Sequence, residues 1–199
     1  MTRRQASPAP DGPADVLERA APPRSSTVRV LGIDPGATIG WGILDVGPRM
    51  AHFVLCGDFS ARTDVELLAA LAELERLAVA HVPAVVAVER VVDVHGCERM
   101  GSGYAEGLAR SNWVGGEIAG LARAMANQDR RAGRPRPLQV ATVAATCWRS
   151  VLVGSRSATD ARVAQMIRLR VPTWPAVSNA HQRDGAGVAL WAGLNRRAA

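Results

Sequence analysis

Hydrophobic and polar positions alternate in a way that predicts three consecutive strands near the start of the folded chain. An apolar run at residues 28–33 predicts a buried strand, which stops at Asp34 before a Pro-Gly turn. A second run at 39–44 and a third at 50–59 predict two further strands. The short first turn indicates that the first two strands form a hairpin. The sequence therefore places a carboxylate where a core strand meets a tight turn.

Longer periodic segments predict helices in the rest of the chain. Leucines at helical spacing over residues 64–81 predict an amphipathic helix, and the apolar run 84–89 predicts a buried strand that ends at Glu89. The remaining predicted elements are a loop at 92–103, a helix at 105–127, a short strand at 138–141, a helix capped by Thr142 that runs to 153, a helix capped by Ser157 or Thr159 that runs to 170, and a closing helix at 178–195. This order predicts an α/β domain with a mixed five-stranded sheet, its first three strands antiparallel, flanked by helices.

The first part of the chain differs in composition from the rest. Prolines are scattered among Ala, Ser and Arg over residues 1–26, a segment that cannot bury enough apolar area to offset its ordering entropy. We therefore expect a disordered tail at 1–26 and one folded domain at 27–199.

Composition narrows the class of protein. A chain of 199 residues with 48% hydrophobic content is long enough for one domain with a substantial core. No apolar stretch is long enough to span a bilayer, and the N-terminus lacks the apolar region of a secretory signal. The three cysteines, Cys56, Cys97 and Cys147, are far apart and predict buried thiols in a reducing compartment. We expect a cytoplasmic protein without a membrane partner.

The charge balance points to a polyanionic partner. The net charge is +6 with a pI near 10.7, and all 24 basic residues are arginine. The planar guanidinium of arginine suits phosphate well, so the composition is compatible with nucleic-acid binding.

Acidic residues gather at one predicted edge of the sheet. If the strands ending at Asp34 and Glu89 lie parallel and adjacent, both carboxylates emerge at the carboxyl end, where open α/β sheets usually build their sites. On the closing helix, His181 and Asp184 are three residues apart and share a face. Hard divalent cations prefer such oxygen ligands, and two of them can activate water in phosphodiester hydrolysis.

Each member of this group also has a simpler interpretation. Asp34 can belong to ordinary turn chemistry, and Glu89 can pair with Arg90 or another arginine at a strand end. His181 can cap or pack, and Asp184 can form an ion pair with Arg183 or Arg149.

Four segments of the chain resemble RuvC-type Holliday-junction resolvases, which are RNase H-like nucleases. They occur in the family's order and approximate spacing over residues 28–195, and they read LGIDPGATIGWGILD, AVVAVER, WRSVLVGSRSATDARVAQMI and HQRDGAGVALWAG. The resemblance implies an RNase H-like sheet and an endonuclease that cuts four-way DNA junctions as a homodimer.

The resemblance also implies roles for individual residues. Asp34, Glu89 and Asp184 would hold Mg²⁺ or Mn²⁺, with two ions per active site. His181 would ligate one ion or position the attacking water. Arg149 stands where the family has a basic residue that contacts DNA. Arg156 and Arg162 are further candidates for DNA-backbone contacts, with a solvated helix face as the alternative. No residue of the sequence indicates a helicase partner.

Three positions depart from the family pattern. Val91 and Val92 stand where the family has an aromatic that stacks on an opened base. Asp160 stands where the family has a lysine, six residues after Gly154 of the family's V-x-G motif. Gly185 and Gly187 replace alanine or other helix formers in the last motif.

Two other functions fit parts of the pattern. A phosphate-binding ATPase of the actin and sugar-kinase group also begins with a strand, an acid and glycines, but it needs a second lobe for which this chain has no room. A non-catalytic branched-DNA-binding protein with the same fold would be indifferent to Mg²⁺, whereas a nuclease would require it.

Overall fold

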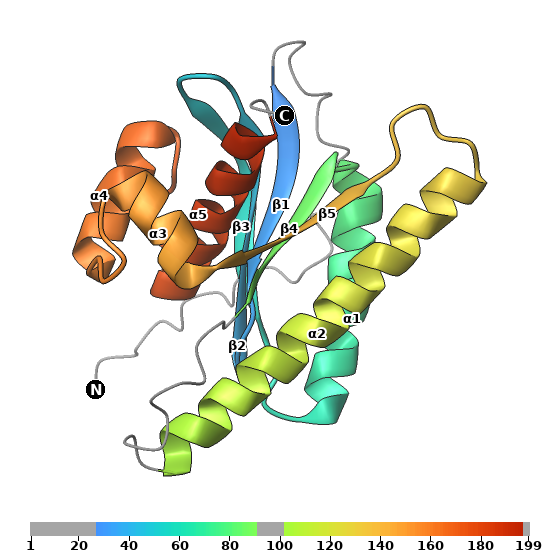
Figure 1. The fold of residues 1–199 in the computed structure, drawn as a ribbon, viewed down its shortest axis with the longest axis horizontal. Coiled ribbons are helices and arrows are strands. Elements are labelled where there is room, and N and C mark those ends of the chain that lie inside the picture. Colours follow the sequence, from blue (N-terminus) through green and yellow to red (C-terminus); the bar gives the residue numbers. More distant parts are fainter. Residues whose placement is uncertain (1–26, 91–101, 197–199) are drawn as a thin grey trace, which may run out of the picture.

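A computed structural model describes residues 27–90 and 102–196 of the chain (Figure 1). The predicted tail at 1–26, most of the predicted loop at 92–103, and the departures at Val91 and Val92 lie outside these residues. The elements are β1 (Val28–Asp34), β2 (Thr38–Val46), β3 (Ala51–Ser60), α1 (Asp64–His81), β4 (Val85–Arg90), α2 (Ser102–Arg131), β5 (Gln139–Ala144), α3 (Ala145–Val153), α4 (Asp160–Arg170) and α5 (Ala180–Asn195).

The strands form one mixed sheet in the order β3-β2-β1-β4-β5. β1, β2 and β3 pair antiparallel, while β4 lies parallel to β1 and β5 lies parallel to β4. The predicted five-stranded mixed sheet is therefore confirmed. Ile33 pairs with Val88, so the residues that follow them, Asp34 and Glu89, lie at the same level near the carboxyl ends of neighbouring parallel strands.

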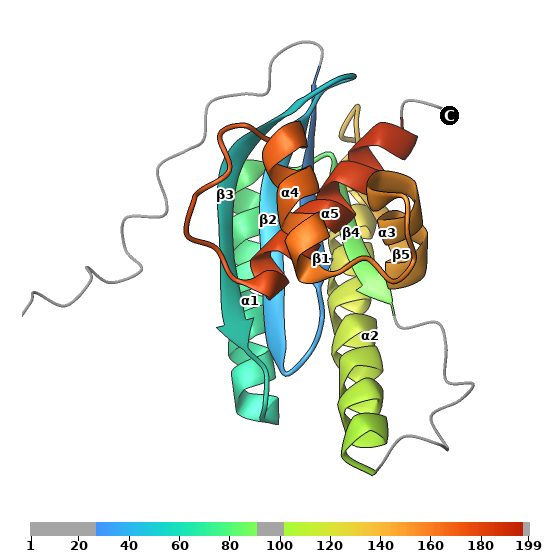
Figure 2. The same cartoon turned by 90° about the vertical axis from the view of Figure 1, so that its left-hand side faces the viewer.

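Helices cover both faces of the sheet, as Figures 1 and 2 show. α3, α4 and α5 lie on one face and α1 and α2 on the other. Each face has its own hydrophobic core: Trp148 and Ile167 belong to the first, Leu74 and Ile118 to the second. Alternate residues of the central strand supply the two cores, because successive side chains of a strand point to opposite faces. Val30 thus packs in the first core and Leu31 in the second.

Local polar side chains explain where most helices begin. Thr63 forms a capping box with Glu66 at the start of α1, and Asn179 forms one with Gln182 at the start of α5. Of the two candidate caps for α4, Thr159 is the one that accepts a backbone N–H. The prediction that Thr142 caps the next helix is wrong. β5 continues through this residue to Ala144, whose side chain cannot cap α3.

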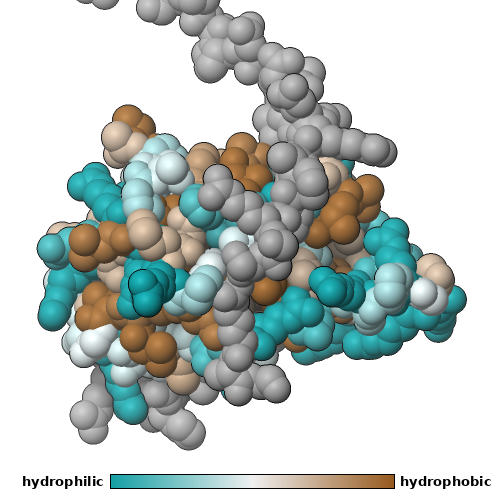
Figure 3. Space-filling model, turned by 90° about the horizontal axis from the view of Figure 1, so that it is seen from above, coloured by the Kyte–Doolittle hydropathy of each residue, from teal (hydrophilic) through white to brown (hydrophobic). Residues whose placement is uncertain are grey.

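The long helix α2 extends beyond its predicted range at both ends. It includes Arg130 and Arg131, which lie beyond the predicted helix end at residue 127. The loop residues that follow the helix, up to Arg136, are exposed, and Figure 3 shows hydrophilic side chains gathered at this end of the molecule.

Two expectations from composition can be compared with the structure. None of the helices in the described ranges is long and apolar enough to cross a membrane. The expectation of buried thiols is wrong for Cys147, which is exposed, whereas Cys56 is half-buried. Cys97 lies outside the described residues.

Candidate active site

Two strand ends and one helix bring the four predicted residues together. Asp34 ends β1, Glu89 lies one residue before the end of β4, and α5 carries His181 and Asp184 in its first turns. The side chains of Asp34 and Asp184 are each 15% exposed, so they lie at a partly covered edge of the sheet. The expectation that these residues share the carboxyl edge is correct for their positions.

Glycines let α5 lie almost against the backbone of the sheet. A Cβ at Gly40 of β2 would lie 2.1 Å from the carbonyl oxygen of His181, well inside van der Waals contact. From the helix side, a Cβ at Gly185 would lie 2.8 Å from Trp41 Cα. Gly185, which departs from the family pattern, is therefore required by this close approach. The approach places the first turns of α5 over the carboxylates.

His181 contacts Asp34 directly. Its Nδ1 lies 3.1 Å from Asp34 Oδ2, and this hydrogen bond raises the pKa of the imidazole. The His181 side chain is half exposed, at 50%. A ring nitrogen is thus held at the carboxylate while the other part of the ring faces solvent.

Asp184 forms an ion pair with Arg149. The guanidinium donates from Nη2 to Asp184 Oδ2 at 2.5 Å, and from Nη1 to the Ala158 carbonyl oxygen at 3.3 Å. Burial nevertheless raises the pKa of Asp184 to about 6, opposed by Arg149 and assisted by Asp34. Of the two ion-pair partners considered for Asp184, the structure selects Arg149.

Glu89 is the most strongly perturbed carboxyl group of the cluster. Burial, together with the neighbouring charges of Asp34 and Asp184, raises its pKa to about 8. The Nε1–H of Trp148 donates to Glu89 Oε2 at 2.7 Å and acts in the opposite direction. Carboxylates so close together repel one another, and a cation between them would relieve the repulsion.

The chemistry of this donor set fits a divalent cation, although its present arrangement is not a completed metal site. Within the described residues, no group of three or more His, Cys, Asp or Glu side chains is arranged to hold a metal ion. Instead, each acid is contacted by another side chain of the protein. His181 contacts Asp34, Arg149 contacts Asp184, and Trp148 contacts Glu89. Arg149 supplies the positive charge that a cation would otherwise bring.

The other two predicted DNA-binding arginines lie on the α3–α4 side of the sheet. Arg156 and Arg162 are both exposed. On the opposite side, Glu89 lines an open hollow of about 200 Å³ together with Arg90 and Arg123. Sequence reasoning did not single out Arg123, because an isolated arginine on a long helix carries no local signal.

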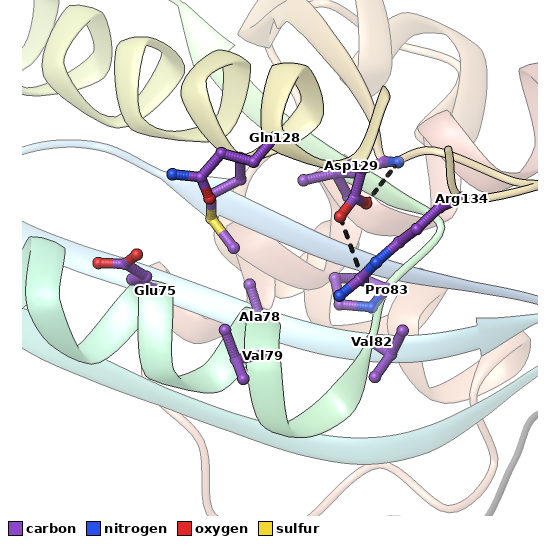
Figure 4. A pocket seen from close by; sticks show the side chains of 10 residues that line it. Glu75, Ala78, Val79, Val82, Pro83, Gln128, Asp129 and Arg134 are labelled. Atoms are coloured by element: carbon purple, nitrogen blue, oxygen red, sulfur yellow. Dashed lines mark hydrogen bonds and ion pairs between the residues drawn. The ribbon is translucent and has the colours of Figure 1, made fainter. Parts of the chain in front are cut away.

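A separate pocket of about 150 Å³ lies at the other edge of the sheet. It is lined mainly by apolar residues, and Val82, Pro83 and Leu138, which precede β4 and β5, are among them. Figure 4 shows Asp129 in this pocket paired with Arg134. In this pocket Asp129 is neutralised by Arg134, and Glu75 is the only other acidic residue among the described residues that line it. The carboxylate edge therefore remains the candidate site.

Comparisons with known proteins find relatives that match most of the chain. The chain is 30% identical over 177 residues to the crossover junction endodeoxyribonuclease RuvC of Granulibacter bethesdensis, covering 86% of this chain and 88% of that protein. It is 27% identical over 185 residues to the RuvC of Rhodopseudomonas palustris, covering 84% and 94%. The chain belongs to the RuvC family. No family model matches the sequence.

Solved structures show the same fold. The RuvC of Thermus thermophilus, determined in complex with a Holliday junction substrate, has a TM-score of 0.63 at 21% identity. The aligned region covers 86% of this chain and 96% of the Thermus thermophilus chain. The yeast mitochondrial Holliday junction resolvase has a TM-score of 0.53 at 14% identity, covering 91% and 85%. The predicted RNase H-like architecture of this RuvC-family chain is confirmed.

Two further residues contact the site of this RuvC-family chain and were missed by sequence reasoning. Asp58 of β3 accepts hydrogen bonds from Asn179 Nδ2 at 3.0 Å and Gln182 Nε2 at 2.8 Å, which ties the first turn of α5 to the edge strand. Trp148 contacts Glu89 across 59 positions of sequence. The only sequence signal for the tryptophan is indirect, because Gly187, which departs from the family pattern, lies against its ring.

Proposed function

We propose that this RuvC-family protein is a divalent-metal-dependent endonuclease that hydrolyses phosphodiesters in branched DNA and resolves four-way junctions by paired nicks. The observation that carries the proposal is the meeting of Asp34, Glu89, His181 and Asp184 at one partly buried sheet edge. Family membership supplies the reaction class, and the basic composition of the chain suits a DNA substrate.

The carboxylates are assigned to metal binding. Asp34, Glu89 and Asp184 would hold Mg²⁺ or Mn²⁺, two ions per site, with His181 as a further ligand. Bound divalent cations lower the pKa of water and stabilise the leaving oxygen in phosphodiester hydrolysis. His181, held by Asp34, can alternatively orient the attacking water through its exposed ring.

Arginines on both sides of the carboxylate edge are assigned to the DNA backbone. Arg156 and Arg162 extend the site over α4, and Arg123 extends it along α2. Arg149 is assigned both to the ion pair with Asp184 and to the DNA backbone. Its guanidinium can leave Asp184 for a phosphate once another cation neutralises that carboxylate. Replacing Arg156 or Arg162 by alanine should reduce the slope of log K against log salt by about 0.9 for each lost phosphate contact.

The symmetry of the substrate suggests the assembly. Two matched cuts in a junction with two-fold symmetry require two active sites related by the same symmetry, so we propose a homodimer. Sedimentation equilibrium at micromolar concentration tests this assignment. We place the enzyme in a cytoplasm, where free thiols such as Cys56 stay reduced.

A cleavage assay tests the proposed function. The substrates are a four-way junction, a matched linear duplex and a fork, each with Mg²⁺, with Mn²⁺ and with chelator, at one stated salt concentration. We expect symmetric paired nicks in the junction and no cutting in chelator. Cutting of forks as well would retain the metal mechanism and remove junction specificity. Binding without cutting under every metal would instead identify a non-catalytic branched-DNA-binding protein.

Substitution of one carboxylate of the cluster tests its catalytic role, and the same substitution at an exposed aspartate is the control. Asp34→Asn should abolish cleavage and preserve junction binding, because it removes a charged ligand and keeps the side-chain shape. Asp64→Asn, a substitution of the same kind at an 80% exposed position on α1, should leave cleavage unchanged. Cutting at the normal rate by the Asp34 variant would remove this residue from the catalytic set.

A further inference from the structure

One fully buried tryptophan contacts the carboxylate cluster from inside the protein. Trp148 lies on α3 at 0% exposure, and its Nε1 is 2.7 Å from Glu89 Oε2. Buried indole N–H groups usually find an acceptor, and many neutral acceptors would serve. Here the acceptor is an ionisable group of the site, so this bond is charge-assisted when Glu89 is ionised.

The last helix is shaped to receive this indole. A Cβ at Gly187 of α5 would lie 2.5 Å from Trp148 Cζ3, so an alanine does not fit beside the ring. Gly187 is the second glycine that departs from the family pattern, and Trp148 is its physical reason. The ring is held between α5 and the sheet, and its N–H has little freedom to turn away from Glu89.

Consecutive residues of α3 therefore contact two different carboxylates. Trp148 holds Glu89 through Nε1, and Arg149 holds Asp184 through Nη2. Arg149 also stacks near the indole, with its guanidinium carbon 5.2 Å from the ring centroid. One turn of helix thus orients a strand-borne acid and a helix-borne acid together.

We propose that Trp148 is a positioning residue for the metal site: its indole N–H occupies Oε2 of Glu89, sets the rotation of that carboxylate, and leaves Oε1 for the cation. This inference rests on the proposed function, because it gives Glu89 a metal to bind. Partners that orient a metal ligand typically contribute about 10- to 100-fold to metal affinity or activity. Removing the N–H should therefore weaken cation binding by about that factor.

The test compares two buried tryptophans that each donate one hydrogen bond. Trp148→Phe removes the donor to Glu89, whereas Trp174→Phe removes a donor to a neutral acceptor, Ser178 Oγ at 2.9 Å. Trp174 is also buried, at 7% exposure. We expect Mg²⁺ affinity, measured by calorimetry without DNA, to fall by about 10- to 100-fold in Trp148→Phe. Trp174→Phe should bind Mg²⁺ as the unsubstituted protein does.

A spectroscopic measurement on the unsubstituted protein supplies a second readout. The indole ¹H–¹⁵N resonance of Trp148 should shift as Mg²⁺ is added, while that of Trp174 should not, each resonance being assigned by its loss in the corresponding variant. If Trp148→Phe does not fold, 3-benzothienylalanine at position 148 replaces the N–H by sulfur in a ring of nearly the same shape. It then serves for both the affinity measurement and the assignment.

The outcomes separate the two proposals. If the unsubstituted protein neither binds Mg²⁺ nor cuts a junction, the proposed function fails and this inference fails with it. If it binds and cuts, but loss of the Trp148 N–H leaves Mg²⁺ affinity unchanged, only the positioning role is overturned. Equal losses of affinity in the Trp148 and Trp174 variants would likewise overturn it, because they would indicate a general packing effect.

Discussion

The close approach of α5 to β2 predicts a large effect for a single methyl group at Gly40. This residue pairs with Asp34 on one side and Asp58 on the other, directly beneath the backbone of His181. An alanine Cβ would lie 2.1 Å from the His181 carbonyl oxygen, whereas ordinary contact begins at 3.4 Å. The obstacle is backbone, so side-chain rotation cannot relieve it. In Gly40→Ala, the first turn of α5 must therefore move by about 1.3 Å.

Two magnitudes follow from this displacement. A misplacement of about 1 Å in catalytic groups costs about 10²-fold in rate, so single-turnover junction cleavage should slow by about that factor. Overpacking of this kind typically costs about 1 to 3 kcal/mol of unfolding free energy. For a chain of this size, that corresponds to a fall in Tm of about 2 to 12 °C. The cleavage rate is measured at 25 °C with saturating Mg²⁺, after circular dichroism has shown that the variant is folded.

Gly120→Ala is the matched control. Gly120 lies on α2, and a Cβ there would have no heavy atom within 4 Å. Alanine should stabilise this helix by about 0.5 to 1 kcal/mol without altering cleavage. A folded Gly40→Ala variant that cuts at the rate of the unsubstituted protein would refute the reasoning, since it would show that the position of α5 does not limit catalysis.

Three further predictions concern packing and charge. Gly187→Ala should destabilise the protein by about 1 to 3 kcal/mol in urea unfolding, and Trp148→Phe in the same chain should recover part of this loss by making room for the methyl group. Asp45→Ala should cost about 3 kcal/mol, because the 5%-exposed Arg29 side chain loses an ion pair of 2.7 Å, and a cost below 1 kcal/mol would contradict the importance of the pair. Burial and the Arg29 charge lower the pKa of His81, so the unfolded chain binds this proton more readily than the folded chain does. The free energy of unfolding should therefore fall as the pH decreases below about 6.5. His81→Leu should make the dependence of unfolding free energy on pH flatter between about pH 5 and 7.

Much of the fold follows from local patterns in the sequence. The strand around Leu31 is apolar on both faces, because helices cover both sides of the sheet, and it was predicted within a residue of its bounds. The cap at Thr159 was among the predicted alternatives because a threonine before a periodic segment has a local reason to bind a helix N–H. The error at Thr142 has a tertiary cause: pairing of β5 with β4 extends the strand past a residue that would otherwise suit a helix cap.

The candidate site divides in the same way. The sequence alone determined that Asp34 and Glu89 lie at the carboxyl ends of apolar strands and that His181 and Asp184 share a helix face, because those properties depend on neighbours a few residues away. Only the tertiary structure decided what touches them. Arg149 on Asp184 and Trp148 on Glu89 are contacts across 35 and 59 positions of the chain. Such contacts depend on how closely α3 and α5 pack on the sheet, and that distance is set by small residues whose effect appears only when the two surfaces meet.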